Sequence, residues 1–362
     1  MNNGTNETVV LENAVFLGID EHENSIAVAR GKGKEKSVDR TFGTTERDYA
    51  KFREWVEQFA QPGTPVYAAY EASQTGPRLA RRLQAWGWTC YVIAPHDLPR
   101  SPKARRRKCD PEDARRILGA LRGHVLAGNE LAVCWLPDDQ TMDDREIVRE
   151  RLSLGEKIAA AKNAIHSLCK RYSQKRPQTV GAWTCAHREW LRQLIKAETL
   201  KVGARLRLQS LLNQLTVLEQ ERTTFDKAIV ELARQQRHRA RCTALRQFRG
   251  VGFLVAMTYL VEIGDPRRFQ NRRQIGAYWG LIPSSFESGE SGERKGHITH
   301  QGSPRVRKVL SQAAWVLVRD KAHPLSEWYH RTAALRGSKR AIVGVMRRLA
   351  IQMWHRALEL TG

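Results

Sequence analysis

Residues 14–20 read Ala-Val-Phe-Leu-Gly-Ile-Asp, and after a short polar turn residues 25–30 read Ser-Ile-Ala-Val-Ala-Arg. Apolar runs of this length on either side of a turn predict two buried strands, paired antiparallel, at the start of a sheet. The patterns that follow alternate: a strand over 37–42, a helix over 46–59, a strand over 65–70, a helix over 78–85 and a strand over 89–94. We therefore predict an α/β domain over residues 12–130.

Two helical heptad seams follow this domain. The first comprises Ile147, Leu154, Ile158, Ala161, Ile165, Leu168 and Tyr172, with Arg151 as its one break, and the second comprises Leu208, Leu211, Leu215, Leu218, Phe225, Ile229 and Leu232, with Arg222 as its polar position. Apolar steps of three and four residues predict a coiled-coil helical region over 140–240. The two helices can pair as an antiparallel hairpin in one chain or between subunits, and the pattern fits both.

The pattern changes again after residue 241, and we predict a third, mainly helical domain over 242–362. Arg249-Gly-Val-Gly252 lies between two short predicted helices and resembles a helix-hairpin-helix turn. In such a turn Gly250 and Gly252 would let backbone N–H groups approach a phosphate. A Gly/Ser-rich loop is expected over 284–302, followed by helices over 305–319 and 341–358.

Charge is distributed unevenly along the 362 residues. The chain has 61 Lys and Arg against 38 Asp and Glu, a net charge of +23, of which residues 1–139 contribute +1 and residues 140–362 contribute +22. Such a basic surface releases counterions when it neutralises phosphates, which predicts a nucleic-acid partner. A basic surface that is only solvated is the alternative.

The cysteine content and the apolar stretches of the chain indicate the cellular compartment of the protein. The six cysteines are far apart, without a C-x-x-C pair, and so predict neither a zinc site nor a disulfide framework. The first 30 residues lack a basic start followed by an apolar run, and no stretch approaches 18 uninterrupted apolar residues. We expect a cytoplasmic protein that makes no use of a membrane.

Four carboxylates are candidates for a metal site. Asp20 ends the first predicted strand, Glu71 directly follows a later one, and Asp110 and Asp113 lie one turn apart at the start of a helix. Oxygen-only ligands suit Mg²⁺, and two such ions roughly 4 Å apart can assist phosphodiester cleavage. The structural alternative is that Asp110 caps the helix and Asp113 favours its dipole.

Basic residues precede the last two acids directly: Lys103, Arg105, Arg106, Arg107 and Lys108. A basic run beside an acidic pocket can hold phosphates next to metals, although it also fits a solvated helix flank.

A second candidate site lies in the Gly/Ser-rich loop. Ser288 precedes a glycine and is followed by Arg294, Lys295, His297 and His300. A serine hydroxyl can attack phosphorus when basic neighbours stabilise the developing charge. From the chemistry alone, a flexible loop that only contacts phosphate fits these residues better.

Five motifs in order carry a resemblance to a known family: Gly18-Ile-Asp20-Glu-His, Tyr70-Glu71-Ala, Cys109-Asp110-Pro-Glu-Asp113-Ala-Arg, Arg249-Gly-Val-Gly252, and Gly280-Leu-Ile-Pro continuing to Phe286-Glu-Ser288-Gly and Gly296-His-Ile-Thr. With them the chain, over roughly residues 14–358, resembles the DEDD insertion-sequence transposases of the IS110 family, which are bridge-RNA-guided recombinases. Two departures are an extra residue after Glu71 and Arg249 where proline usually precedes the glycine.

The resemblance implies a RuvC-like, ribonuclease-H-type domain joined by a coiled coil to a C-terminal transposase domain. It implies that Asp20, Glu71, Asp110 and Asp113 bind Mg²⁺, two ions per site, and that Ser288 is the nucleophile that becomes covalently linked to DNA. It further implies a homo-oligomer, a dimer or tetramer, in which the acids of one subunit and the serine of another form a composite site. Donor DNA, target DNA and a structured guide RNA would be its partners, in the cytoplasm of a bacterium or archaeon.

Two other functions stay open at this point. A hydrolytic, structure-specific endonuclease of the Holliday-junction-resolving type would use the four carboxylates alone. An inactivated relative would only bind and regulate nucleic acid. Ser284, Ser285 and Ser291 lie close enough in sequence to Ser288 to be alternative nucleophiles.

Overall fold

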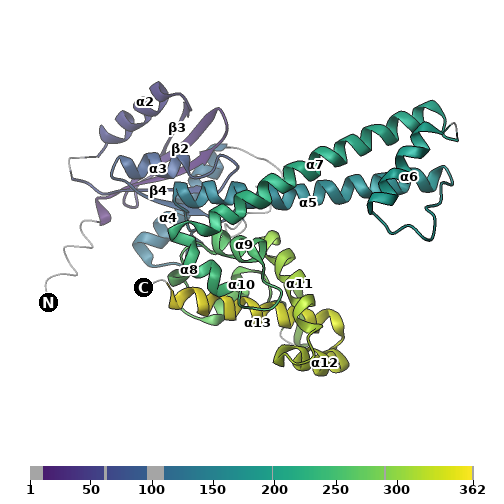
Figure 1. The fold of residues 1–362 in the computed structure, drawn as a ribbon. Coiled ribbons are helices and arrows are strands. Elements are labelled where there is room, and N and C mark those ends of the chain that lie inside the picture. Colours follow the sequence, from purple (N-terminus) through teal and green to yellow (C-terminus); the bar gives the residue numbers. More distant parts are fainter. Residues whose placement is uncertain (1–10, 61–62, 96–109, 198, 289–290, 361–362) are drawn as a thin grey trace. The chain divides into compact units, whose positions relative to one another are not determined.

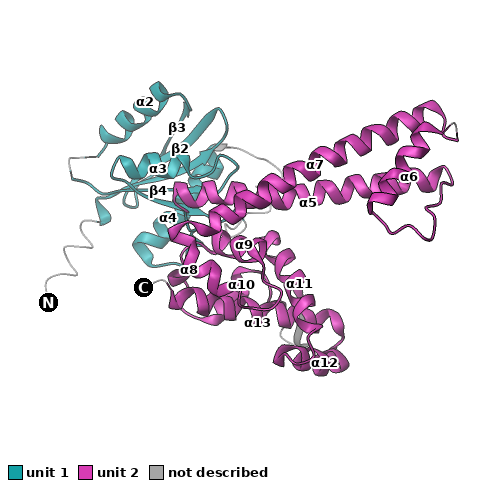
Figure 2. Ribbon diagram, in the orientation of Figure 1, with its two compact units in different colours: residues 1–136 teal, residues 137–362 magenta. Residues whose placement is uncertain are grey.

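The computed structural model describes residues 11–60, 63–95, 110–197, 199–288 and 291–360 (Figure 1). The chain forms two compact units, residues 1–136 and 137–362 (Figure 2). The predicted α/β domain corresponds to the first unit, and the predicted regions 140–240 and 242–362 both lie in the second. The boundary expected near residue 241 stays a prediction.

The first unit is built on a five-stranded sheet with the order β3-β2-β1-β4-β5. Its strands are β1 (Val15–Glu21), β2 (Ser25–Lys32), β3 (Val38–Gly43), β4 (Val66–Glu71) and β5 (Thr89–Ile93). β1 pairs antiparallel with β2 and parallel with β4, and β4 pairs parallel with β5. The predicted antiparallel opening is confirmed, and the alternating strands and helices confirm a mixed α/β unit.

Helices cover both faces of this sheet. Val15, Leu17 and Ile19 of β1 share a core with α2 (Glu46–Glu57) and α3 (Arg78–Ala85). Ala14 and Phe16 contribute instead to a core with α4 (Asp110–Ala127). Because successive side chains of a strand point to opposite faces, the even-numbered residues of β1 face α4.

The second unit begins with two long helices, α5 (Asp139–Arg171) and α7 (Val202–Arg234), which pack antiparallel in the same chain (Figure 1). Seam residues of both helices, such as Ile158, Ile165 and Leu208, lie in one buried core. The intramolecular hairpin is thus present. Tyr172, predicted as the last seam residue of the first helix, is 40% exposed because it caps α5 rather than continuing it.

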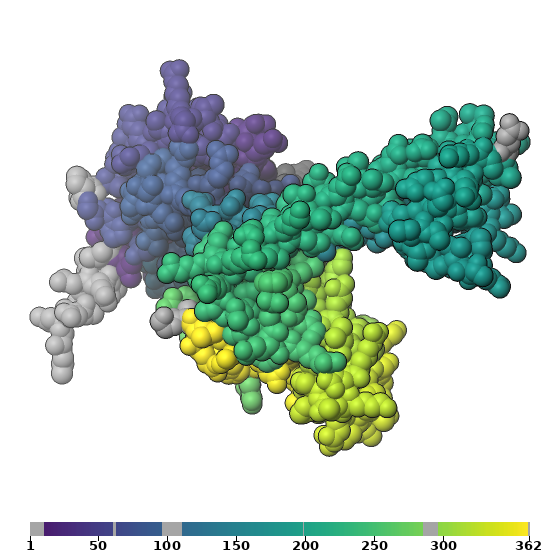
Figure 3. Space-filling view, viewed as in Figure 1, coloured from purple at the N-terminus to yellow at the C-terminus, as the bar shows by residue number. Residues whose placement is uncertain are grey.

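The far end of this hairpin carries α6 (Cys185–Lys196), which contributes Leu191 and Leu194 to the hairpin core. In the space-filling view the far end stands clear of the other helices of the second unit (Figure 3). No helix within the described ranges is both long and apolar enough to cross a bilayer.

The base of the hairpin shares a core with the remaining helices, to which Val148, Leu152, Ile229 and Leu232 contribute. These helices are α8 (Gln236–Leu245), α9 (Phe253–Ile263), η1 (Pro266–Arg268), α10 (Arg272–Tyr278), α11 (Pro304–Val318), α12 (Pro324–Arg336) and α13 (Ser338–Glu359). A shared core of this kind makes the hairpin base part of the C-terminal helical body.

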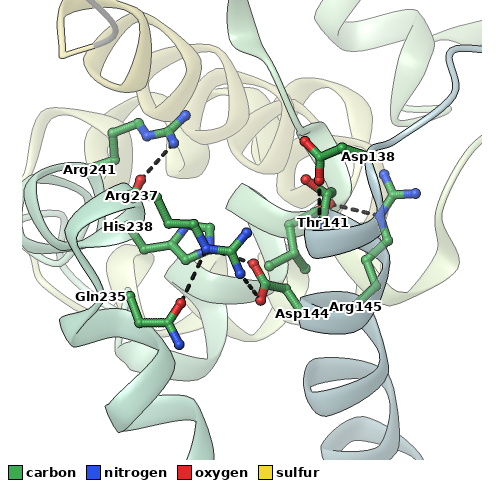
Figure 4. Close-up of polar contacts among 9 residues, drawn as sticks. Asp138, Thr141, Asp144, Arg145, Gln235, Arg237, His238 and Arg241 are labelled. Carbon is green, nitrogen blue, oxygen red and sulfur yellow. Dashed lines mark hydrogen bonds and ion pairs between the residues drawn. The ribbon is translucent and has the colours of Figure 1, made fainter.

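A buried charged cluster joins α5 to α8 at the same place (Figure 4). The carboxylate of Asp144, 1% exposed, accepts hydrogen bonds from Arg237 Nη2 and, at 2.7 Å, from His238 Nε2. Arg241 Nη2 donates to the backbone carbonyl of Arg237 at 2.8 Å. A carboxylate out of water needs such partners, so the cluster holds the two helices in one arrangement.

Candidate functional site

Two of the predicted acids lie side by side at one edge of the sheet. β1 and β4 run parallel, with Ile19 opposite Tyr70 as the last pair of the ladder, so that Asp20 and Glu71 follow on adjacent strands. Both side chains point to the α4 face, because Ala69 and Phe16 of the same alternation contribute to the α4 core. The expectation that a carboxylate extends from each strand end toward its neighbour agrees with this arrangement.

Gly18 allows α4 to lie directly against β1. A Cβ atom at this position would lie 2.1 Å from the backbone oxygen of Ala114 and 2.4 Å from the backbone nitrogen of Leu118, distances that no side chain could occupy. The glycine of the Gly-Ile-Asp motif therefore sets the approach of the helix that carries Asp113 toward the strand that carries Asp20.

Arg116 joins the strand acid to the helix acid. Its Nη2 lies 2.7 Å from Glu71 Oε1 and 3.3 Å from Asp113 Oδ1. The Arg116 side chain is 17% exposed, and within the described part of the chain its Nε and Nη1 are buried without a hydrogen-bond partner. Two carboxylates thus converge on one cationic nitrogen, which neutralises charges that would otherwise repel each other.

Asp20 contacts a histidine of its own motif, since His22 Nε2 lies 3.2 Å from Asp20 Oδ2. Glu21, which follows Asp20 on β1, points to the opposite face of the sheet. There it accepts hydrogen bonds from Thr75 Oγ1 at 2.6 Å and from Ser73 Oγ at 3.5 Å. Burial raises the pKa of Glu21, and the two hydroxyl donors oppose that shift. Glu21 is therefore a structural acid of the α2 and α3 face and does not belong with Asp20.

Asp110 is the first residue of α4, one turn before Asp113, and its side chain lies outside what the structure describes. Among the side chains that are described, no three acidic, histidine or cysteine groups stand close enough to form a ready metal cage. The donor set at the sheet edge still fits Mg²⁺, because it consists of carboxylate oxygens and because two of them already converge on a cation. The basic run Lys103, Arg105, Arg106, Arg107 and Lys108 lies outside the described residues.

The segment predicted as a Gly/Ser-rich loop is instead a β-hairpin of β6 (Pro283–Ser288) and β7 (Ser291–Ile298). Ser288 ends β6 opposite Ser291, while Arg294 and Lys295 lie on β7 opposite Phe286 and Ser285. The register shifts twice within the hairpin, which explains why no strand alternation is visible in the sequence. The nucleophile candidate and the two basic residues thus share one small sheet.

Glycines fix the base of this hairpin. At Gly280 a Cβ would lie 2.2 Å from the backbone oxygen of Gln301, and at Gly302 it would lie 1.8 Å from that of Tyr278. Both residues have positive φ, 62° and 72°, which a side chain would strain. The two ends of the hairpin segment are therefore held against each other by backbone contact.

The predicted phosphate-contact glycines differ from each other. Gly250 has φ 81° and packs against α11, where a Cβ would lie 2.7 Å from the carbonyl oxygen of Ala313. Gly252 is the N-cap of α9, and a Cβ there would meet open space. Helix packing accounts for the need for glycine at position 250, while a phosphate contact at either residue stays a prediction.

Comparison with known proteins identifies the relatives of this chain. Residues 17–174 match the model of DEDD transposases of IS110 elements, and residues 242–330 match the family described as Transposase IS116/IS110/IS902. A protein of Sinorhizobium fredii, y4qE, described as a transposase, is 30% identical over 371 residues, covering 95% of this chain and 88% of that one.

The chain belongs to the IS110 family of transposases. It is thus a DNA transposase, as the motif resemblance implied. The transposase for insertion sequence element IS1533 of Leptospira borgpetersenii is 25% identical, covering 84% of this chain and 86% of that one. A pilin gene-inverting protein of Moraxella bovis is 27% identical over 164 residues, which are 44% of this chain and 50% of that one.

Arg116 is the site residue that the sequence motifs did not single out. It lies three residues after Asp113 and thus on the same side of α4. This helical spacing is the sequence feature that could have indicated Arg116 as a neighbour of Asp113. Its partner Glu71 lies 45 residues away along the chain, and helix periodicity carries no information about such a pair.

Proposed function

We propose that this transposase is an RNA-guided DNA recombinase, which cuts and rejoins strands through a covalent phosphoserine intermediate. Asp20, Glu71, Asp110 and Asp113 would form its acidic centre and Ser288 its nucleophile. The observation that carries the proposal is the convergence of Glu71 and Asp113 on Arg116 at the strand edge that Asp20 also ends. The strand order, with three antiparallel strands followed by two parallel ones, supports a RuvC-like assignment for the first unit.

The four carboxylates would hold Mg²⁺, two ions per site, which would activate the attacking oxygen and stabilise the leaving oxygen of a phosphodiester. Gly18 would keep the helix acids within reach of the strand acids. Arg116 would balance the charge of Glu71 and Asp113 before metal is bound.

In the covalent step, Ser288 Oγ attacks phosphorus and a new phosphorus–oxygen bond forms to the serine. The bond between phosphorus and the leaving deoxyribose oxygen breaks, that oxygen takes up a proton, and the serine proton passes to a base. Rejoining reverses the step, with the hydroxyl of another strand end as the attacking group and Ser288 as the leaving group. No oxidant or nucleotide cofactor is needed because the phosphoserine conserves the phosphodiester bond.

Donor and target DNA would be bound by the basic second unit, because residues 140–362 carry +22 of the net charge of +23. A structured guide RNA would pair with both DNAs, so that base pairing selects the sequence and the protein contacts the backbones. A dimer or tetramer would combine the acids of one subunit with Ser288 of another. Relatives named for inverting pilin genes support a reaction in which cut ends are rejoined rather than released.

The proposal is tested by incubating the full-length protein and its co-expressed RNA with labelled donor and target DNA and Mg²⁺, followed by denaturing electrophoresis. A protein-linked DNA band should form, and both Ser288→Ala and Asp113→Asn should abolish it. Ser284→Ala, at one of the alternative nucleophiles, should keep the band, because the Ser284 hydroxyl already donates to the backbone oxygen of His297 at 3.0 Å.

Free cleaved ends that persist in Ser288→Ala, without linked protein, would instead favour the hydrolytic endonuclease. A band that is lost in Ser291→Ala and kept in Ser288→Ala would move the nucleophile to the other strand of the hairpin. Omission of the RNA separates guided cutting from cutting that the protein directs alone.

A further inference from the structure

A cavity of about 320 Å³ lies at the far end of the helical hairpin, between the end of α5 and α6. Its lining includes His166, Lys170, Lys175, Arg176, His187 and Trp190. This end of the hairpin stands clear of the other helices of its unit (Figure 3). The volume is at the lower end of the range for ligand sites, about 300 to 1,000 Å³.

Aromatic rings form one wall of the cavity. The rings of His187 and Trp190 are stacked, with centroids 5.6 Å apart and an angle of 18° between their planes. The His166 ring lies 5.0 Å from that of Trp183 and 6.0 Å from that of His187. His166 is exposed, Trp190 is partly exposed, and both residues line the cavity.

The backbone around the cavity is strained. Three described residues other than glycine have positive φ, and two of them flank this cavity: Ser173 with φ 54° and Trp183 with φ 63°. A positive φ costs free energy for a bulky residue such as tryptophan. The N–H of Trp183 donates to His187 Nδ1 at 2.9 Å, which holds the strained turn and places the proton of a neutral His187 ring on Nε2.

The charge at the cavity is positive. Lys170, Lys175 and Arg176 line it, and none of the residues that line it is acidic. Glu219 on α7 is paired with Arg188 at 2.8 Å and Lys162 at 3.3 Å, and Glu189 on α6 is paired with Arg192 at 3.3 Å. The cavity thus offers aromatic faces and unbalanced cations together.

We propose that this cavity binds an unpaired nucleotide of a single-stranded nucleic acid, with the base against His166 and Trp190 and the adjoining phosphates against Lys170, Lys175 and Arg176. Rings inside a recess reach the face of a base only when that base is unstacked and unpaired, which excludes an intact duplex. RNA and DNA single strands share this chemistry. The site extends the proposed function by adding a contact for an unpaired strand, and it does not depend on Ser288 or Mg²⁺.

The test is fluorescence anisotropy of the nucleic-acid-free full-length protein with labelled single-stranded RNA, single-stranded DNA and duplex DNA of equal length. The charge variant is Lys170→Gln/Lys175→Gln/Arg176→Gln. Its matched control, Lys157→Gln/Arg171→Gln/Arg192→Gln, removes the same charge from exposed residues of α5 and α6 outside the cavity. The ring variant is His166→Ala, which removes an exposed side chain, and its urea unfolding midpoint is measured beside the binding.

The cavity variant should weaken single-strand binding about tenfold or more, the control triple by about threefold or less, and His166→Ala by about fivefold. Duplex binding should change equally in both triples, and strands carrying a photoreactive thio-base should cross-link to peptides containing His166 or Trp190. A larger loss for RNA than for DNA would identify RNA as the strand, and the reverse would identify DNA.

Equal losses in the two triple variants would overturn the proposal, because they would show a diffuse basic surface. Unchanged single-strand binding in His166→Ala together with cross-links elsewhere would also overturn it. The assay involves no cleavage, so its failure is distinct from a missing phosphoserine adduct, which would count against the proposed function alone.

Discussion

Arg116 Nη2 lies 2.7 Å from Glu71 Oε1, so a helix residue balances the charge of a strand residue at the edge where β1 and β4 both end. The same nitrogen lies 3.3 Å from Asp113 Oδ1. The guanidinium therefore competes with any added cation for two of the four candidate carboxylates. The affinity of the site for a divalent metal should therefore depend on Arg116.

Arg116→Met should raise the affinity of the metal-free protein for Mg²⁺ or Mn²⁺. Removal of a positive charge next to two carboxylates strengthens their attraction for a divalent ion by roughly tenfold, after allowance for partial solvent screening. Isothermal titration of the purified full-length protein measures the dissociation constant.

Arg115→Met is the comparison for that experiment, since the neighbouring Arg115 pairs with Asp39 on β3. An Arg116→Met protein with unchanged or weaker metal affinity would show that Arg116 acts chiefly by positioning Glu71 and Asp113.

Gly18→Ala should destabilise the first unit and displace α4. The new methyl group would lie 2.1 Å from the carbonyl oxygen of Ala114, which is backbone and cannot rotate away. Overpacking of this kind costs about 1 to 3 kcal/mol, and urea unfolding measures it. Gly119→Ala on α4 is the control: a Cβ there meets nothing within 4 Å, and a helical glycine replaced by alanine gains about 0.5 to 1 kcal/mol. Equal stability of the two variants would contradict close packing at Gly18.

Much of the first unit could be predicted from sequence, because its signals are local. The apolar runs at residues 14–20 and 25–30 predicted β1 and β2, and the helix predicted over 78–85 coincides with α3. The strand ends then placed Asp20 and Glu71 at one edge, since parallel neighbours in one sheet end on the same side. Heptad steps predicted α5 and α7 for the same reason.

Other features depend on contacts that local patterns do not encode. The β6–β7 hairpin has two register shifts and a Gly/Ser-rich composition, so it resembled a loop. No helix is predicted from the sequence over α6, although Thr184 caps it by accepting from the N–H of His187. α10 and α12 were not predicted either. Asp144 pairs with Arg237 and His238, which lie 93 and 94 positions further along the chain. Only folding brings these residues together.

Asp144→Ala should destabilise the second unit strongly. The substitution leaves Arg237 partly buried and His238 buried without their shared acceptor, and breaking a buried pair on one side costs about 3 to 5 kcal/mol. Asp143→Ala removes the same charge from the adjacent exposed position and should leave the midpoint of urea unfolding nearly unchanged. Equal effects of the two substitutions would show that the cluster does not anchor α5 to α8.

His187 should make the stability of the second unit depend on pH. Burial lowers the pKa of His187 in the folded protein, and the nearby Arg176, His166 and Arg188 lower it further. The unfolded chain therefore binds more protons than the folded chain as the pH falls through the usual histidine pKa of about 6.5, and the stability of the folded chain falls with the pH.

The side-chain oxygen of Asn can accept the Trp183 N–H in place of His187 Nδ1, so His187→Asn should keep the turn and remove this contribution. Urea unfolding at about pH 7.5 and about pH 5.5 should show a smaller loss of stability in His187→Asn than in the unaltered protein. An identical loss in both proteins would mean that His187 becomes protonated without cost, contrary to its burial between α5 and α6.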